Sequence, residues 1–146
     1  MKIEAAFKNL HRLHMDSSPL IYYVEENLTY LARMDEIVTR IEDSLITTLS
    51  SIILLPEILT HPVRQGRNDL VGAYREILLT TIHLIDVNNS IAERAVDLRA
   101  RYNLRTPDAL HVATAWMAGC DAILTNDTGM KRVREINVLV LDDLQV

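Results

Sequence analysis

The sequence has almost no cysteine: Cys120 is the only one in 146 residues. A single cysteine excludes an internal disulfide framework and any zinc site built from cysteines alone. Long hydrophobic runs are also missing. The longest clear run, Ile52–Leu55, ends at Pro56, whereas a membrane span needs about 18 consecutive apolar residues. No apolar segment follows Lys2 and Glu4, so we expect no secretory signal. These absences predict a cytoplasmic protein with no membrane partner.

Positive charge is in deficit, because 15 lysines and arginines face 20 aspartates and glutamates and leave a net charge of −5. This deficit argues against a protein that binds nucleic acid through bulk positive charge. It leaves open a nucleic-acid enzyme, because bound divalent cations would reverse the local potential of a carboxylate cluster. The proportions of 49% apolar and 24% charged residues are those of an ordinary globular protein.

The chain has no repeat, low-complexity tract or linker rich in proline, glycine or serine. Its apolar spacing predicts helices at 18–27, 28–41, 52–59, 68–78, 91–98, 106–117 and 130–135. Short apolar runs predict strands at 10–15, 45–49, 83–87, 122–125 and 138–141. Strands and helices that alternate at these lengths predict a single α/β domain over residues 1–146 with a mostly parallel sheet.

Helix ends have recognisable residues. Ser18 is expected to cap the first of these helices, with proline directly after it. Ser50 or Ser51 can cap the third helix, and Pro56 is expected to bend it. Thr106, again followed by proline, is expected to cap the most apolar helix.

The first strand has the weakest pattern, because 10–15 contains His11, Arg12 and His14. The α/β pattern nevertheless requires a strand that runs into Asp16. Side chains three positions apart point to opposite faces of a strand, so the two histidines do not form a convincing metal-binding pair.

Four carboxylates stand near the predicted carboxyl ends of strands: Asp16, Glu57, Asp108 and Asp127. In open parallel sheets, ligands collect at this edge, where helix N-termini also point. We therefore expect the four side chains to converge. Asp121 precedes its strand and is expected at the opposite edge.

Such a cluster suits Mg²⁺ or Mn²⁺, since these hard cations prefer oxygen ligands. Ions of this kind can activate water and stabilise the leaving oxygen in phosphodiester cleavage. The simpler alternative is that Asp16 and Asp108 only improve helix N-termini, where negative charge is favourable. That alternative leaves Glu57 and Asp127 unexplained.

Three segments of the chain resemble the PIN domain, and in particular its VapC-like toxin ribonucleases. They are Met15–Tyr23 (MDSSPLIYY), Leu55–Leu59 (LPEIL) and, most specifically, Leu104–Asp127. Their order and spacing agree with the family from about Leu10 onward.

The resemblance implies a three-layer α/β/α sandwich around a mostly parallel sheet. It points to Asp16, Glu57, Asp108 and Asp127 as acids that hold Mg²⁺ or Mn²⁺ for endoribonuclease action, the same residues that the strand ends indicate. Many members of the family are toxins that an antitoxin protein holds inactive, and many assemble as dimers. The resemblance therefore implies an RNA substrate, an antitoxin partner and a homodimer.

Ser17 and Thr125 match small hydroxyl positions of the family beside the acids. An oxygen there could orient a metal-bound water or a phosphate. The chain departs from the family in two places. Fifteen residues precede Asp16, which indicates that residues 1–9 are an added N-terminal element or that the start codon is placed too early. Pro56 could also shift the neighbouring Glu57 carboxylate.

Other polar residues have more than one interpretation. His111 is expected to be a hydrogen-bonded core or rim histidine rather than a ligand. The basic residues of 131–134 could contact RNA phosphates or simply end a short surface helix. Arg105 could pair with an acid or reach substrate.

The leading hypothesis is a metal-dependent endoribonuclease of the toxin type. The alternative is a catalytically inactive PIN-like module that binds RNA or a protein. A phosphatase with a nucleophilic aspartate is disfavoured, because Ser18 stands two residues after Asp16, where such enzymes often have a second acid.

Overall fold

The computed structural model describes all residues from Met1 to Val146. Its sheet contains β1 (Arg12–Met15), β2 (Thr47–Ser51), β3 (Ile82–Ile85), β4 (Ala122–Thr125) and β5 (Asn137–Val140). The strand order is β3-β2-β1-β4-β5, and every neighbouring pair is parallel. The predicted α/β class is confirmed, and the sheet is entirely parallel rather than mostly so. β1 lies at the centre, so the residue that follows it stands at the middle of the carboxyl edge.

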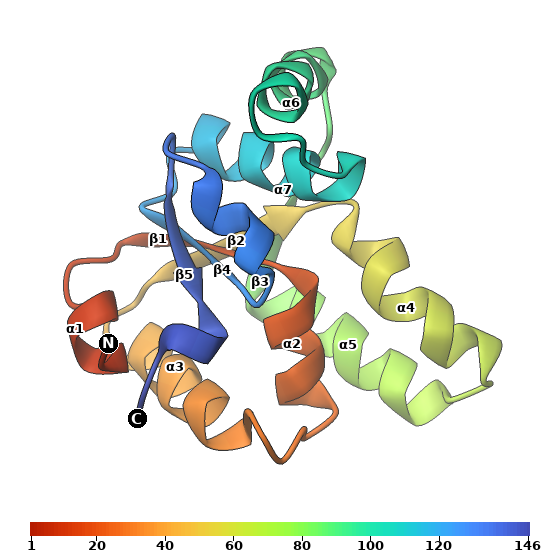
Figure 1. The fold of residues 1–146 in the computed structure, drawn as a ribbon. Helices are drawn as coiled ribbons and strands as arrows, with labels where there is room; N and C mark the ends of the chain where they lie inside the picture. The colour runs from red at the N-terminus through yellow and green to blue at the C-terminus, as the bar shows by residue number, and fades with distance from the viewer.

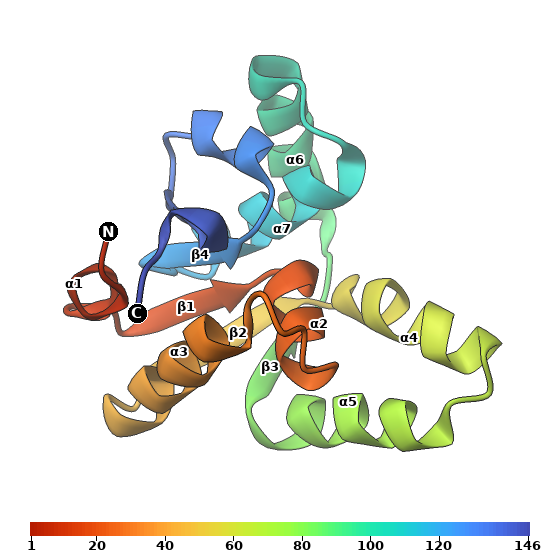
Figure 2. The same ribbon diagram turned by 60° about the horizontal axis from the view of Figure 1, so that its bottom comes forward.

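Helices cover both faces of the sheet (Figure 1). They are α1 (Ile3–Phe7), α2 (Ser17–Val24), α3 (Leu31–Asp43), α4 (Leu54–Arg64), α5 (Asn68–Thr80), α6 (Asn89–Tyr102) and α7 (Thr106–Met117), with short 3₁₀ turns η1 (Thr128–Arg132) and η2 (Leu141–Asp143). One face carries α6 and α7, and the other carries α1, α2 and α3. Figure 2 shows α4 and α5 side by side as an antiparallel pair that extends from the sheet. The arrangement is the predicted three-layer sandwich.

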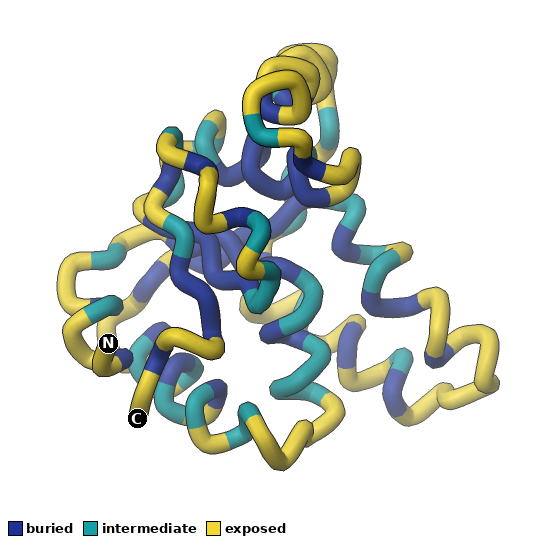
Figure 3. Tube along the Cα trace, viewed as in Figure 1, coloured by how far each residue is buried: buried dark blue, intermediate teal, exposed yellow.

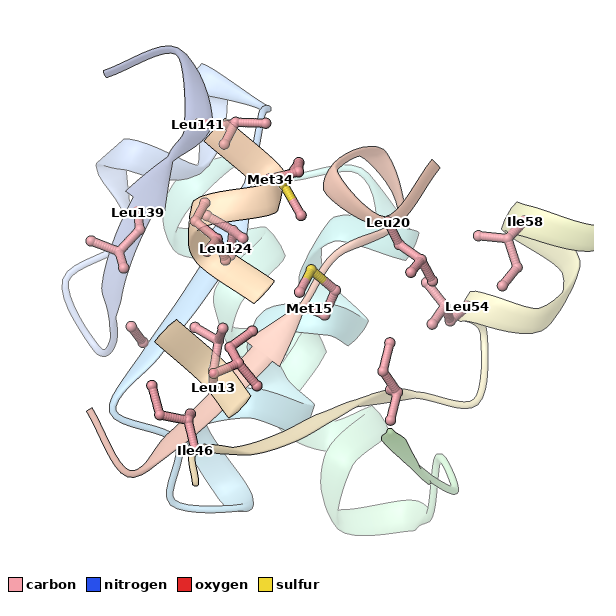
Figure 4. Close-up of a cluster of buried hydrophobic side chains, with 14 of the residues drawn as sticks. Leu13, Met15, Leu20, Met34, Ile46, Leu54, Ile58, Leu124, Leu139 and Leu141 are labelled. Atoms are coloured by element: carbon pink, nitrogen blue, oxygen red, sulfur yellow. The ribbon is translucent and has the colours of Figure 1, made fainter. Parts of the chain in front are cut away.

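Each face of the sheet has its own hydrophobic core, because strand side chains alternate between the faces. Leu13 and Met15 of β1 belong to the larger core with α1–α5 (Figure 4). Ile123 of β4 belongs to the smaller core beneath α6 and α7. His14 alternates with Leu13 and Met15 and therefore faces the α7 side. Figure 3 shows the buried strands at the centre and the exposed outer turns of α6 and of the α4–α5 pair.

Three predicted helix caps are wrong, and the first two are those of α2 and α4. Asp16, not Ser18, is the N-cap of α2, and its carboxylate accepts a hydrogen bond from the Ser17 N–H. Ser50 and Ser51 lie in β2, and α4 begins only at Leu54. Strand pairing keeps Ser50 and Ser51 in β2, so Ile53 precedes α4 and makes no side-chain capping bond. Asp16 therefore has a structural task in addition to any chemical one.

α4 contains two prolines, Pro56 and Pro62. Pro56 lies in the first turn, where its missing N–H has no intrahelical partner to lose. Pro62 is the proline in the helix interior. The α7 cap is also different from expectation, since Arg105 precedes the helix and makes no side-chain capping bond. Gly119, with φ of +70°, ends the turn after α7 in a conformation that favours glycine.

Most of the remaining elements lie within a few residues of their predicted bounds, whereas α1 has no counterpart among the predicted helices. The first strand is shorter than expected and begins at Arg12. The strand after α5 ends at Ile85, so Asp86 follows it rather than lying within it. The predicted 130–135 helix is the 3₁₀ turn η1. None of the helices combines the length and the apolar character needed to cross a membrane.

The two ends of the chain meet at one side of the sheet. Lys2 forms a parallel bridge with Gln145, and the Ile3 N–H donates to the Gln145 carbonyl over 2.9 Å. Ile3 and Phe7 of α1 are buried in the larger core. Residues 1–9 are thus packed against the sheet layers. Assignment of residues 1–146 to one domain, with 1–9 as an added element, stays a prediction.

Candidate functional site

Asp16 is the centre of the candidate site, because it directly follows the central strand at the carboxyl edge of the sheet. Only 5% of the residue is exposed. Its Oδ1 accepts from the Ser17 N–H over 2.7 Å, and its Oδ2 accepts from the Thr125 hydroxyl over 2.6 Å. Asp16 therefore stands at the N-terminus of α2 with both oxygens oriented.

Thr125 connects Asp16 to Asp127. While its hydroxyl donates to Asp16, the same oxygen accepts from the Asp127 N–H over 3.0 Å. Asp127 caps η1, and its Oδ1 accepts from the Gly129 N–H over 2.8 Å. Ser17 contributes its backbone N–H to Asp16. The hydroxyl of Thr125 thus fixes the relative position of two acids that come from the ends of β1 and β4.

Asp108 lies in the first turn of α7 and is only 8% exposed. Its carboxylate accepts from Arg105 Nε over 3.0 Å, and the Arg105 side chain is 79% exposed. Burial, joined by the nearby charges of Asp127 and Asp16, raises the pKa of Asp108, although Arg105 opposes this change. The neighbouring carboxylates therefore lie close enough to act on Asp108 electrostatically.

Glu57 enters from the first turn of α4 and meets His111 of α7. Glu57 Oε1 lies 2.5 Å from His111 Nε2, and Asp16 Oδ1 lies 3.5 Å from the same nitrogen. The three side chains have ligand atoms within 4.8 Å of one another. The Glu57 side chain is 27% exposed, whereas the His111 side chain is fully buried. Within this group of three side chains, His111 is therefore the innermost and Glu57 is the one that reaches solvent.

A second buried histidine contacts His111 from the interior of the protein. His14 of β1 is fully buried, and its Nε2 lies 2.8 Å from His111 Nδ1. Burial, with the neighbouring His111 charge, lowers the pKa of His14 well below its usual value. Burial also lowers the pKa of His111, but the hydrogen bond to Glu57 and the charges of Asp16, Glu57 and Asp108 outweigh it and raise that pKa overall.

The donor set fits a hard divalent cation. Asp16, Glu57, Asp108 and Asp127 offer carboxylate oxygens, the ligand type that Mg²⁺ and Mn²⁺ prefer. Arg105 is the one permanent cation paired with any of these acids, and its side chain is mostly in solvent. Burial first, and then the charges of Asp127 and Asp16, raise the pKa of Asp108, so ionisation of this acid is disfavoured beside its neighbours. A bound cation would counter this effect.

The structure thus brings Asp16 and Glu57 together around His111, with Asp108 and Asp127 in electrostatic reach. Asp121 lies at the opposite edge, as expected, where its carboxylate accepts from backbone N–H groups at the start of β1. His11 is exposed while His14 is buried, so the two do not form a pair.

Two of the basic side chains near η1, those of Lys131 and Arg132, have partners within the protein. Lys131 forms an ion pair with Asp143, and Arg132 Nε donates to the Gly129 carbonyl over 3.0 Å. Arg134 donates its backbone N–H to the Tyr102 hydroxyl. Their contact with RNA phosphates stays a prediction. Arg105 pairs with an acid, which is one of the two roles expected for it.

The contact that sequence reasoning missed is the one between His111, Glu57 and His14. His111 was expected to be a hydrogen-bonded core or rim residue, and it is buried and hydrogen-bonded. Its partner Glu57 stands 54 positions earlier, so no local pattern connects the two. One signal was present for His14: with Leu13 and Met15 on one face of the strand, the histidine must lie on the other, under the apolar helix.

Comparison with known families gives one clear match. The sequence profile of the PIN domain matches residues 15–136, which is most of the chain. No curated protein sequence matches significantly.

Solved structures show similarity of fold. A toxin–antitoxin complex from Klebsiella pneumoniae contains a chain with a TM-score of 0.67 and 21% identity, in a match that covers 88% of this chain and 97% of that one. VapBC2 from Rickettsia felis, bound to a DNA fragment from its promoter, contains a chain with a TM-score of 0.69 and 15% identity, in a match that covers 88% and 98%. Identities this low establish a shared fold and nothing finer.

Proposed function

Since this chain belongs to the PIN-domain family, we propose that it is a metal-dependent endoribonuclease that hydrolyses RNA phosphodiester bonds with Mg²⁺ or Mn²⁺. One observation carries the proposal. Carboxylates from β1, α4, α7 and the end of β4 gather at one edge of the sheet, and Arg105 is the only arginine paired with any of them. If these acids served only to cap helices, Glu57 would not be needed, yet it comes from α4 and its carboxylate lies close to Asp16.

Asp16, Asp108 and Asp127 are proposed to hold the metal, with Glu57 as a further ligand or a proton acceptor. When bound, Mg²⁺ or Mn²⁺ supplies an activated water and stabilises the leaving oxygen of the phosphodiester. Thr125 keeps Asp16 and Asp127 in fixed relation through its two hydrogen bonds. Ser17 donates its N–H to Asp16, and its hydroxyl is proposed to stand beside the substrate. The Glu57 side chain is more exposed than those of Asp16 and Asp108, and we propose that incoming water or RNA reaches the site beside it.

The biological role that we propose is that of a cytoplasmic toxin held inactive by an antitoxin protein, with the toxin acting as a homodimer. The support is that the two solved structures described above are toxin–antitoxin assemblies. Family membership and the acidic group support nuclease chemistry independently of that role. Activity can therefore be tested on the purified chain without knowledge of the antitoxin.

The test is cleavage of a mixture of structured RNAs in Mg²⁺ or Mn²⁺ by the wild type, Asp16→Asn and the control Glu93→Gln. Asparagine caps helices about as well as aspartate, so Asp16→Asn keeps the start of α2 while removing a ligand charge. Glu93 is an exposed acid on α6, on the outside of the sandwich. We expect the wild type and Glu93→Gln to cut RNA, and both Asp16→Asn and EDTA-treated wild type to be inactive.

A folded wild type that is free of antitoxin and leaves RNA intact in both metals would contradict the proposal. The chain would then be better described as a PIN-like module that binds RNA or a protein. Cleavage by Asp16→Asn at the wild-type rate would show that the site is assigned wrongly or that the activity comes from a contaminant.

A further inference from the structure

Two buried histidines connect the interior of the protein to the acidic group. His14 Nε2 lies 2.8 Å from His111 Nδ1, and His111 Nε2 lies 2.5 Å from Glu57 Oε1 and 3.5 Å from Asp16 Oδ1. Both histidines are fully buried. Geometry alone would allow His111 to be a nitrogen ligand of a metal held by Asp16 and Glu57. The positions of the hydrogens in the His14–His111 and His111–Glu57 contacts argue against His111 as a ligand.

The contact between His111 and Glu57 requires a proton on the histidine. An ionised carboxylate can only accept hydrogen bonds, and imidazole is the more basic of the two groups. His111 Nε2 must therefore carry hydrogen and donate to Glu57. Two atoms bound to one octahedral ion through bonds of about 2.1 Å lie about 3 Å apart. The observed 2.5 Å is shorter than that, and shorter still than the usual length of about 2.7–2.9 Å for a charge-assisted N–H···O bond, so the two atoms are in direct hydrogen-bond contact.

His14 fixes this tautomer from beneath. A neutral His111 with hydrogen on Nε2 has a lone pair on Nδ1, which accepts from His14 Nε2–H. The other ring nitrogen of His14, Nδ1, is buried and has no hydrogen-bond partner. In this arrangement that atom bears only a lone pair. The opposite arrangement, with a lone pair on His111 Nε2, would move the His14 proton to Nδ1 and bury an N–H without an acceptor, which proteins strongly avoid.

We infer that His111 is a positioning residue rather than a metal ligand, that its Nε2–H orients the Glu57 carboxylate beside Asp16, and that His14 locks the tautomer required for this. The inference rests on the proposed function, because Glu57 and Asp16 matter here as metal-binding acids. Groups that orient metal ligands through hydrogen bonds typically contribute 10–100-fold to metal affinity or activity. The effect should therefore appear in metal binding itself, without RNA.

The first experiment measures Mn²⁺ binding by calorimetry for the wild type, His111→Leu, His111→Gln and the control His61→Leu. Glutamine keeps an N–H near the position of Nε2, whereas leucine keeps only volume. We expect affinity to fall about 10–100-fold in His111→Leu and to stay within about threefold of wild type in His111→Gln. His61 lies on α4 with Glu57 but is exposed, so its substitution should leave binding unchanged. Wild-type affinity in His111→Leu overturns the inference, and thermal melts check that each variant is folded.

The second experiment reads the proton directly in the wild type and needs no variant to fold. Nitrogen-15 spectra of the histidine rings distinguish a protonated from an unprotonated nitrogen. We expect His111 Nε2 to keep its hydrogen in metal-free protein and after saturation with diamagnetic Mg²⁺. Loss of that hydrogen when Mg²⁺ binds would make His111 a ligand and overturn the inference.

The two proposals fail in different ways. A wild type that binds Mn²⁺, retains the Nε2 proton and leaves RNA intact contradicts the nuclease proposal alone. A wild type that cuts RNA while His111→Leu binds Mn²⁺ normally contradicts the positioning role alone. A wild type that binds no Mn²⁺ contradicts both.

Discussion

The two edges of the sheet each hold a carboxylate next to the central strands, and the two carboxylates have opposite surroundings. At the amino edge, Asp121 Oδ2 accepts from the His11 and Arg12 N–H groups over 2.7 and 2.9 Å. The backbone hydrogen bonds from Arg12 and His11 lower the pKa of Asp121. At the carboxyl edge, burial and the charges of Asp127 and Asp16 raise the pKa of Asp108.

These different surroundings indicate that Asp121 has a structural role, whereas Asp108 is available to bind a ligand. The backbone satisfies Asp121, which ties the starts of β1 and β4 together. Asp108 has one arginine, itself mostly in solvent, against two neighbouring acids. A carboxylate whose charge is already compensated gains little from a cation, whereas a crowded one gains much. Substitutions at the two positions should therefore change different properties of the protein.

The largest effect expected from this comparison is on catalysis and metal binding. Asp108→Asn should lower RNA cleavage more than ~100-fold, because loss of a direct ligand should exceed the 10–100-fold typical of groups that only orient ligands. In the wild type, saturation to 100 times the Kd should add about 2.7 kcal/mol of stability, and most of this gain should vanish in Asp108→Asn.

Asp121→Asn is the matched control, since it removes one carboxylate charge from the same sheet. Its cleavage rate and its stabilisation by Mn²⁺ should equal those of the wild type. Equal losses in both variants would show that the assay reports general negative charge rather than a site at one edge.

A smaller effect is expected on stability as a function of pH, with opposite signs at the two positions. Because the folded-state pKa of Asp108 is raised, wild-type stability falls as pH rises from the unfolded value near 3.9 through the raised value. Because the folded-state pKa of Asp121 is lowered, its contribution is present above about pH 3.9 and is lost as pH falls through the lower folded value. Urea unfolding in EDTA between pH 3 and 7 measures both.

We expect Asp108→Asn to gain stability relative to wild type as pH rises, with the gain reduced by the lost Arg105 pair. Asp121→Asn should be about 1 kcal/mol less stable at pH 7, after allowance for solvent screening of an exposed group, and the gap should close below pH 4. Parallel pH curves for all three proteins would remove the distinction between the two edges.

The smallest effect should come from Arg105→Gln. This substitution removes the cation that competes for Asp108, and an exposed ion pair contributes at most about 1 kcal/mol. Mn²⁺ affinity should therefore rise, by less than about fivefold, and the rise should shrink at high salt. A fall in affinity, measured by the same calorimetry, would mean that Arg105 assists the site rather than competing within it.

Sequence predicted the last third of the fold best. The end of α7 at Met117 and the β4 bounds Ala122–Thr125 agree with expectation to the residue, and Thr106, expected as the cap, is the first residue of α7. In that region a proline near the helix start, a glycine after its end and a wholly apolar strand leave few alternatives. The start of the chain was harder, because β1 contains a buried histidine whose partner lies on α7. Its polar composition makes sense only after the two layers are packed.

In the candidate site, too, some residues could be placed from the sequence and others could not. Asp16 and Asp127 could be placed from the rule that strand ends share an edge, which needs only strand positions. The meeting of Glu57 with His111 depends on how α4 leaves the sheet, and that orientation comes from burial of Leu54 and Ile58 in the larger core. Ser18 and Asp16 were both credible caps, and the length of β1 decided between them. Tertiary packing, rather than local preference, determined each of these details.

The pairing of β1 with β4 also sets when the site can exist during synthesis. Asp16 is made early, but the Thr125 hydroxyl that orients it stands 109 positions later. A growing chain with β1, β2 and β3 already paired still lacks the neighbour on the other side of β1. Contacts this distant in sequence form late, since the intervening chain must first be closed into a loop. Any activity of this edge is therefore withheld from the nascent chain until residues 122–127 have emerged and β4 has docked.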